Sequence, residues 1–105
     1  MLADSEVEIE AAKWVILKAA WMNENGLDAR HQNAIAKLYG SNIANNVVDR
    51  IMQIFGGMGY TKEFPIERWY REARLWRIFE GTDEMLRRTI ARNLIKGHEK
   101  VGEWI

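Results

Sequence analysis

A single proline, Pro65, interrupts a chain of 105 residues. Proline breaks the interior of an α-helix because it lacks a backbone N–H and its ring clashes with the preceding turn. Long stretches on both sides of Pro65 are therefore free to form helices. Apolar residues recur in these stretches at close to helical spacing, and no segment shows the strict alternation of a strand. The sequence predicts an all-α chain, most simply an up-and-down helical bundle.

Four helices are predicted from this periodicity and from start and stop signals. Ser5 and Glu8 have the spacing of a capping box at the start of the first helix. Thr82 is suited to cap the last one. Gly40 lies inside the second helix, where glycine costs about 1 kcal/mol relative to alanine, and close packing against a neighbour would explain it. The helices are expected over residues 5–25, 28–55, 65–78 and 83–96, with a frayed tail after them.

The composition is that of a globular chain without an excess of charge of either sign. Hydrophobic residues make up 48% and charged residues 29%, and 15 basic side chains balance 15 acidic ones. This balance argues against a nucleic-acid-binding protein that relies on broad positive charge. The absence of cysteine excludes disulfides, cysteine-ligated zinc, iron–sulfur clusters and thiol nucleophiles.

The length and the apolar pattern of the chain limit its number of domains and its cellular location. We expect residues 1–105 to form a single helical domain. No apolar run reaches the roughly 18 residues of a membrane-spanning helix, and the N-terminus lacks the basic-then-apolar pattern of a signal peptide. These features predict no membrane span and a cytoplasmic protein, or a protein of the mitochondrial matrix if the source is eukaryotic.

The segment Gly56-Gly57-Met58-Gly59 permits two interpretations. The dinucleotide-binding fingerprint requires a strand before its glycines, and a helix is predicted here, so that interpretation fails. A helix end followed by a tight turn explains the glycines structurally. Alternatively, glycines let a backbone approach a ligand such as a phosphate closely. The pattern alone leaves both open.

Glu80 stands between Phe79 and Gly81, where the third predicted helix ends. A carboxylate near a helix end is usually a solvated surface group. A functional role requires irregular backbone beside an apolar pocket, where desolvation raises the carboxyl pKa toward the range of a general base. Elsewhere, His31 and His98 have no partner at the i±3 or i±4 spacing of a helical metal site, and no metal site is predicted.

The tryptophans favour either a core or an interface. In two of the predicted helices they recur seven residues apart, which places each pair on one helix face. Core packing and a contact between subunits, where tryptophan is enriched, explain these pairs equally well. The residues are Trp14, Trp21, Trp69, Trp76 and, near the C-terminus, Trp104.

Several motifs in the second half of the chain occur in a fixed order. They are Gln53-Ile54-Phe55-Gly56-Gly57-Met58-Gly59-Tyr60, Phe64-Pro65-Ile66-Glu67, Arg71-Glu72-Ala73, Phe79-Glu80-Gly81-Thr82 and Arg88-Thr89-Ile90-Ala91-Arg92. In order and spacing this set closely resembles the C-terminal helical domain of acyl-CoA dehydrogenases. The upstream half, including Ala36-Lys37-Leu38-Tyr39, is also similar to that family, so the resemblance covers nearly the whole chain.

The resemblance implies a function in fatty acid metabolism. Members of the family are flavoproteins that use FAD to oxidise acyl-CoA thioesters to 2-enoyl-CoA. A carboxylate base removes the α-proton while the β-hydrogen leaves as hydride to the flavin. The resemblance also implies a homo-oligomer and an electron-accepting flavoprotein as a partner.

Particular roles follow from the resemblance. Glu80 matches the catalytic base of many members, and its own N–H binds the thioester carbonyl in the family, an oxyanion-hole role. Gly81 belongs to the same substrate-binding segment. The remaining matches concern FAD. Gln53, Gly56 and Gly57 would contact the FAD of a neighbouring subunit, Thr82 would contact FAD in its own subunit, and Glu84 lies where some relatives have glutamine.

Complete members of the family also have an N-terminal helical domain and a middle β-domain, and their C-terminal domain begins with a further helix. A pocket buries most of a large bound ligand, so we expect the isolated chain to be inactive and not to hold FAD. An uncovered apolar face would favour self-association or low stability. Two alternatives stay open, namely a non-catalytic helical module for self-association or docking, and one chain of a split flavoenzyme.

Overall fold

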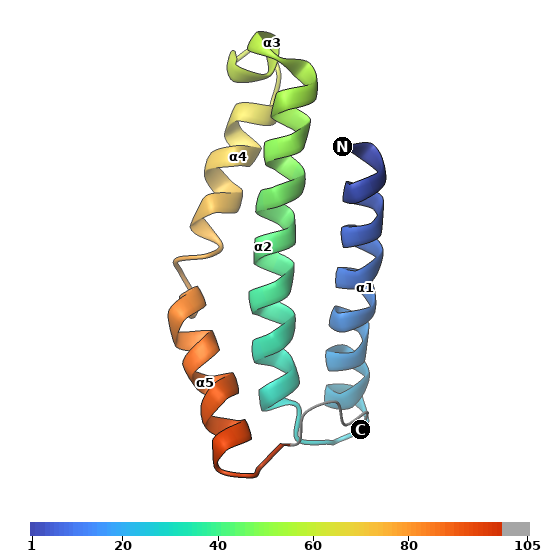
Figure 1. Ribbon diagram of the computed structural model, residues 1–105, viewed down its shortest axis with the longest axis vertical. Coiled ribbons are helices and arrows are strands. Elements are labelled where there is room, and N and C mark those ends of the chain that lie inside the picture. Colours follow the sequence, from blue (N-terminus) through green and yellow to red (C-terminus); the bar gives the residue numbers. More distant parts are fainter. Residues whose placement is uncertain (100–105) are drawn as a thin grey trace.

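The computed structural model describes residues 1–99, and every regular element in that part of the chain is an α-helix (Figure 1). This confirms the predicted all-α class. Two long helices are followed by a one-turn helix and two shorter helices. They are α1 (Leu2–Glu24), α2 (Arg30–Phe55), α3 (Gly57–Tyr60), α4 (Ile66–Leu75) and α5 (Asp83–Ile95).

Helix α2 is the centre of the arrangement. Helix α1 runs along one side of α2, whereas α4 and α5 follow each other along the other side, with α3 at the tip (Figure 1). In the described part of the chain, α1 packs against α2 alone. The molecule is elongated, with extents of 49 × 25 × 22 Å. This flat, up-and-down order leaves the outer faces of α1 and of α4–α5 uncovered.

The residues buried between these helices are mostly small. Both buried residues of α1 are alanines, and two isoleucines supply the largest apolar side chains of the core. Close approach of helix backbones explains the alanines, since small side chains allow neighbouring axes to lie near each other. The buried apolar residues are Ala12, Ala19, Ala29, Ala34, Ile43, Ile66 and Ala73.

The predicted capping box at Ser5 and Glu8 is wrong. Helix α1 begins at Leu2, so Ser5 lies in its first turn, and the Ser5 N–H donates to the Met1 carbonyl at 3.1 Å. The Glu8 carboxylate instead accepts two hydrogen bonds of 2.7 Å from the Arg50 guanidinium on α2. These bonds lower the pKa of Glu8. A charged partner on α2 competes successfully for the carboxylate that a capping box would use.

The other predicted bounds agree closely, with two corrections. The third predicted helix ends at Leu75, because Trp76 and Ile78 continue the chain in tighter turns. Their N–H groups donate to carbonyls three residues earlier, at 3.2 and 2.8 Å. The glycine run, whose structural interpretation is a helix end with a tight turn, also forms the one-turn helix α3. Gly40 lies beside α1, but a Cβ there would be 3.5 Å from Ile16 Cδ1, an ordinary contact, so close packing does not require the glycine.

Charged pairs one helical turn apart lie on α4. Glu67 pairs with Arg71 at 3.0 Å, and Arg68 pairs with Glu72 at 3.8 Å. Among residues 1–99, none of the helices is long and apolar enough to cross a membrane.

The tryptophans within the described residues lie at the surface rather than in the core. Trp14 and Trp21 share the outer face of α1 and are 62% and 48% exposed. Trp69 lies on α4, and Trp76 directly follows that helix; both are more than 40% exposed. These exposures do not support the core interpretation for this chain taken alone. Trp104 lies outside the described residues.

Candidate active site

The linker between α4 and α5 carries Glu80 in an unusual backbone conformation. Glu80 has a φ of 53°, and it is the one non-glycine residue with positive φ between residues 1 and 99. Gly81 follows with a φ of 98°. The left-handed region costs an L-residue roughly 1–2 kcal/mol. The surrounding structure must therefore hold Glu80 in this conformation.

Lys37 of α2 binds this linker through its ammonium group. The Nζ atom donates to the carbonyl oxygen of Phe79 at 3.1 Å and to that of Gly81 at 3.0 Å. It also donates to the carbonyl oxygen of Trp76. A lysine ammonium has three donors, and here backbone carbonyls beyond the end of α4 accept them. One side chain thus fixes three peptide groups of the linker.

Asp83 fastens the other end of the linker, and it is 1% exposed. Its Oδ2 accepts hydrogen bonds from Arg77 Nε at 2.8 Å and from Asn42 Nδ2 at 3.1 Å. Burial raises the pKa of Asp83, but the hydrogen bonds from Arg77 and Asn42 outweigh burial and leave the pKa below its usual value. The ionised carboxylate therefore joins the start of α5 to both the linker and α2.

The backbone N–H groups of Glu80 and Thr82 have no hydrogen-bond partner among residues 1–99. A trans peptide is planar, so its N–H points away from its own C=O, and the structure contains no cis peptide. Since the Phe79 and Gly81 carbonyls face Lys37, the N–H groups of Glu80 and Thr82 point away from it. No described residue accepts a hydrogen bond from either N–H. Both donors are thus available to a ligand.

The remaining residues predicted for this end of the site lie close to Glu80 in the chain. The Thr82 hydroxyl accepts a hydrogen bond from the Met85 N–H at 3.2 Å, which confirms the predicted helix cap. Glu84 is exposed in the first turn of α5. Glu80 itself is exposed, and Phe79 beside it is 43% exposed. The apolar pocket that a buried base requires is therefore not closed by this chain alone.

The second group of predicted residues lies at the far end of α2. Gln53 is exposed in the last turn of α2, and Gly56 ends the helix with a φ of 64°. Gly57 opens α3, and a Cβ built there would meet nothing within 4 Å. Sixteen helical residues separate Lys37 from Gln53, which at ~1.5 Å per residue is roughly 24 Å. The structure therefore does not bring this group together with Glu80.

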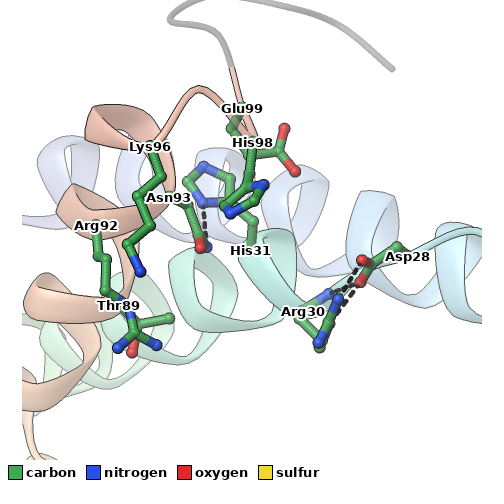
Figure 2. Close-up of a pocket in the computed structure, with 9 residues that line it drawn as sticks. All are labelled: Asp28, Arg30, His31, Thr89, Arg92, Asn93, Lys96, His98 and Glu99. Atoms are coloured by element: carbon green, nitrogen blue, oxygen red, sulfur yellow. Dashed lines mark hydrogen bonds and ion pairs between the residues drawn. The ribbon is translucent and has the colours of Figure 1, made fainter.

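A separate pocket of about 380 Å³ lies where the start of α2 meets the end of α5 (Figure 2). Two of its charged side chains form an ion pair with each other. Arg30 Nη2 lies 2.7 Å from Asp28 Oδ2, and the hydrogen bonds from Arg30 lower the Asp28 pKa to about 2. His31 Nδ1 lies 3.1 Å from Asn93 Nδ2. None of the site residues predicted from the sequence lines this pocket.

Residues 1–95 match the family model described as "Acyl-CoA dehydrogenase, C-terminal domain". The chain belongs to the acyl-CoA dehydrogenase family. It is 40% identical to the short-chain-specific acyl-CoA dehydrogenase of Clostridium acetobutylicum, over 91% of this chain and 25% of that protein. It is 38% identical to the CarC subunit of the caffeyl-CoA reductase–Etf complex of Acetobacterium woodii, with the same coverages.

A solved structure of the same family shares the fold. Butyryl-CoA dehydrogenase from Megasphaera elsdenii superposes with a TM-score of 0.87 at 38% identity, over 90% of this chain and 24% of that chain. The chain thus spans about a quarter of the length of these acyl-CoA dehydrogenase relatives.

The acyl-CoA dehydrogenase motifs led to Glu80 but gave no role to the side chains that hold its linker. Sequence reasoning missed Lys37, Asn42, Arg77 and Asp83. A signal was present, because polar residues recur on a helix with an otherwise apolar stripe. Lys37, Ser41 and Asn45 are four residues apart, and Asn45 Nδ2 donates to the Ala73 carbonyl at 2.7 Å. Such a polar stripe predicts contacts with backbone groups of a neighbour.

Proposed function

We propose that this chain is the C-terminal part of an FAD-dependent acyl-CoA dehydrogenase, with Glu80 as the base that removes the α-proton of the acyl-CoA thioester. The observation that carries the proposal is the conformation of Glu80. It is held at positive φ by the Lys37 contacts from α2, and its own N–H has no partner within residues 1–99. A strained residue with an unused backbone donor is typical of a catalytic segment.

The residues near Glu80 have complementary tasks in this proposal. The Glu80 carboxylate takes the α-proton, and the Glu80 N–H donates to the thioester oxygen, where negative charge develops as that proton leaves. Gly81 lets the chain turn at a φ of 98° directly after the base. The other domains of such an enzyme would cover the exposed apolar side chains around Glu80 and exclude water from the base.

FAD fits the donor groups that the chain leaves unused. When bound, FAD accepts the β-hydrogen of the acyl chain as hydride. The Thr82 N–H and hydroxyl would hold FAD in the same subunit, with Glu84 nearby on α5. Gln53, Gly56 and Gly57 would approach the FAD of a neighbouring subunit, because they lie too far along α2 to share one site with Glu80. No described residue comes within 4 Å of a Cβ built on Gly57, which leaves room for a ligand.

The proposal extends to the rest of the enzyme. Acyl-CoA would be the substrate, and a flavoprotein would accept the electrons, as the name of the caffeyl-CoA reductase–Etf relative suggests for that complex. Since the chain corresponds to about a quarter of its relatives, the remaining domains would come from the same polypeptide or from a partner chain. The chain alone would then be inactive.

Replacing Glu80 by glutamine in the complete flavoenzyme tests the base assignment. We expect E80Q to retain its FAD and its affinity for 2-enoyl-CoA, while reduction of the flavin by acyl-CoA slows roughly 100- to 10,000-fold, the usual contribution of a general base. E24Q, at the exposed end of α1, is the matched control and should reduce normally. An E80Q enzyme with full activity would defeat the assignment.

One observation favours a second candidate, a helical module that docks by its apolar surface. The outer face of α1 exposes Trp14, Leu17 and Trp21.

The visible spectrum of the purified chain, recorded after FAD is added and excess FAD is removed, separates the possibilities. A retained flavin band would show that copies of the chain build a flavin site by themselves. Absence of the band, together with full assembly of the complete enzyme, supports the role of a C-terminal part.

A further inference from the structure

Long-range hydrogen bonds join Lys37 to the segment that carries Glu80. The two residues are far apart in sequence, yet all three donors of the Lys37 ammonium serve carbonyls between residues 76 and 81. Capping the end of α4 would account for the bonds to Trp76 and Phe79. It would not account for the bond to Gly81, which lies on the other side of Glu80.

The positive charge of Lys37 interacts with these carbonyl oxygens and not with a carboxylate. Lys37 forms no ion pair with any carboxylate among residues 1–99, although acidic and basic side chains are equally numerous in the chain. Its Nζ also lies 6.0 Å from the centre of the Phe79 ring, on the residue just before Glu80. A cation so placed has no acidic partner to neutralise it, so its field acts on the adjacent peptide groups.

The effect of that field on the peptide between Phe79 and Glu80 has a definite direction. A cationic donor at the carbonyl oxygen draws electron density toward that oxygen and makes the N–H at the other end of the same peptide a stronger donor. That N–H belongs to Glu80. The peptide between Gly81 and Thr82 is polarised in the same sense, because the Gly81 carbonyl binds the same ammonium at 3.0 Å.

We propose that Lys37 is a positioning residue that orients the Glu80 N–H and strengthens it as the donor to the thioester oxygen of acyl-CoA. This inference rests on the proposed function. Lys37 does not touch the substrate, since its donors are used by the linker carbonyls. It acts through the peptide group, and it also holds Glu80 in the left-handed conformation that the residue would otherwise leave.

The first test uses the full 105-residue chain labelled with ¹⁵N, and it is independent of any activity. Loss of the cation in K37M should move the Glu80 and Thr82 amide proton resonances upfield, as weaker polarisation requires, whereas K37R should retain most of the wild-type shifts. K13M, which removes an exposed lysine of α1, is the matched control. Unchanged Glu80 and Thr82 amides in a folded K37M chain would overturn the proposal. Should K37M fail to fold, K37Q, which keeps a donor and removes the charge, gives the same comparison.

The second test uses the complete flavoenzyme. For K37M we expect kcat to fall roughly 10- to 100-fold, less than the loss of a whole oxyanion-hole donor, with KM changed less than threefold and K37R restoring most of kcat. The infrared carbonyl stretch of bound 2-enoyl-CoA, ¹³C-labelled at the thioester, should move to higher wavenumber in K37M. A merely structural role would lower stability without moving this band, and an unmoved band with wild-type kcat would refute the inference.

The two tests distinguish failure of the proposed function from failure of the proposed role of Lys37. If E80Q is fully active, the proposed base is wrong, and the amide shifts of the chain still report whether Lys37 polarises the linker. If E80Q is inactive but K37M matches the wild type in carbonyl stretch and kcat, the proposed function stands and the role of Lys37 fails.

Discussion

The buried carboxylate of Asp83 depends on two hydrogen-bond donors to stabilise its ionised form. Arg77 and Asn42 both bind Oδ2, while Oδ1 is buried and has no hydrogen-bond partner among the described residues. An ionised carboxylate in this setting is favourable only while both donors are present. Its position at the start of α5 adds a favourable interaction with the helix dipole.

We predict that D83N lowers the free energy of unfolding of the chain by about 1–3 kcal/mol at neutral pH, because the hydrogen bonds lose their charged acceptor. The difference should depend on pH. The folded-state pKa of Asp83 lies below its unfolded value, so its stabilisation is present above pH ~3.9 and is lost as the pH falls through the folded-state pKa.

Urea unfolding at a series of pH values checks this prediction. Wild type and D83N should differ most at neutral pH and converge in acid. E84Q, at the exposed neighbouring position, should stay within about 0.5 kcal/mol of the wild type throughout. A constant difference between wild type and D83N across the series would mean that the carboxylate charge contributes nothing.

Single residues also show where sequence reasoning reaches its limit. Glu80 could be singled out because it stands in a motif beside a helix break. Its positive φ could not be derived, since glutamate rarely adopts that conformation and only contacts from α2 explain it. Lys37 lies 43 positions before Glu80 in the chain, and no local pattern predicts that its ammonium caps this linker. Long-range polar contacts of this kind require the folded arrangement.

At the level of the elements, the glycines after α2 differ in what would prevent another residue at each position. Gly56 ends the helix at positive φ. Gly59 is buried, and a Cβ there would lie 2.9 Å from Phe55 Cβ and 3.2 Å from the Met52 carbonyl oxygen. Gly57 has neither constraint, since its φ is not positive and a Cβ would meet nothing within 4 Å. The fold therefore requires glycine at 56 and 59, whereas the described part of the chain sets no such requirement at 57.

We predict that G59A lowers the free energy of unfolding by about 1–3 kcal/mol, because the added methyl group overpacks the junction of α2 and α3. G57A should leave stability within about 0.5 kcal/mol of the wild type. In the complete enzyme, the same G57A should weaken retention of FAD. Thermal unfolding of the chain and the flavin content of the purified enzyme are the two measurements. Normal flavin content in G57A would remove Gly57 from the proposed cofactor site.

Helix positions could be predicted well because caps and apolar spacing are local signals. The glycine at the end of α2 and Thr82 at the start of α5 act as expected. The predictions fail where a contact with another helix determines the local structure. Glu8 pairs with Arg50 across helices instead of capping α1, and the turns after Leu75 are shaped by Lys37. Both corrections come from α2, which contacts every other helix of the described chain.

The whole molecule is too extended to enclose a core of ordinary size. Its Cα radius of gyration is 16.0 Å, compared with about 13 Å for a compact domain of roughly 100 residues. Alanine forms most of its buried apolar set, whereas large apolar side chains such as Trp14, Leu17 and Trp21 are exposed. Exposed apolar surface of this kind marks a contact with another chain or domain. The proposed role as one part of a larger flavoenzyme accounts for it.

We therefore predict that the isolated chain self-associates through the outer face of α1. Burial of apolar side chains is favourable by roughly 25 cal/mol per Å², and residues 1–99 leave Trp14 and Trp21 largely exposed. Sedimentation velocity at a series of concentrations should show species larger than the 12.3 kDa monomer. Replacing both tryptophans, in W14Q/W21Q, should shift the distribution toward the monomer.

Y60Q provides the matched control, because Tyr60 is 79% exposed but lies on α3 at the tip of the molecule. Its substitution should leave association unchanged if the α1 face is the contact. In the complete enzyme, this face would be covered by other domains or subunits, and W14Q/W21Q should then impair assembly rather than relieve aggregation. A chain that is monomeric at every concentration, and a complete W14Q/W21Q enzyme that assembles normally, would show that the α1 face has no partner.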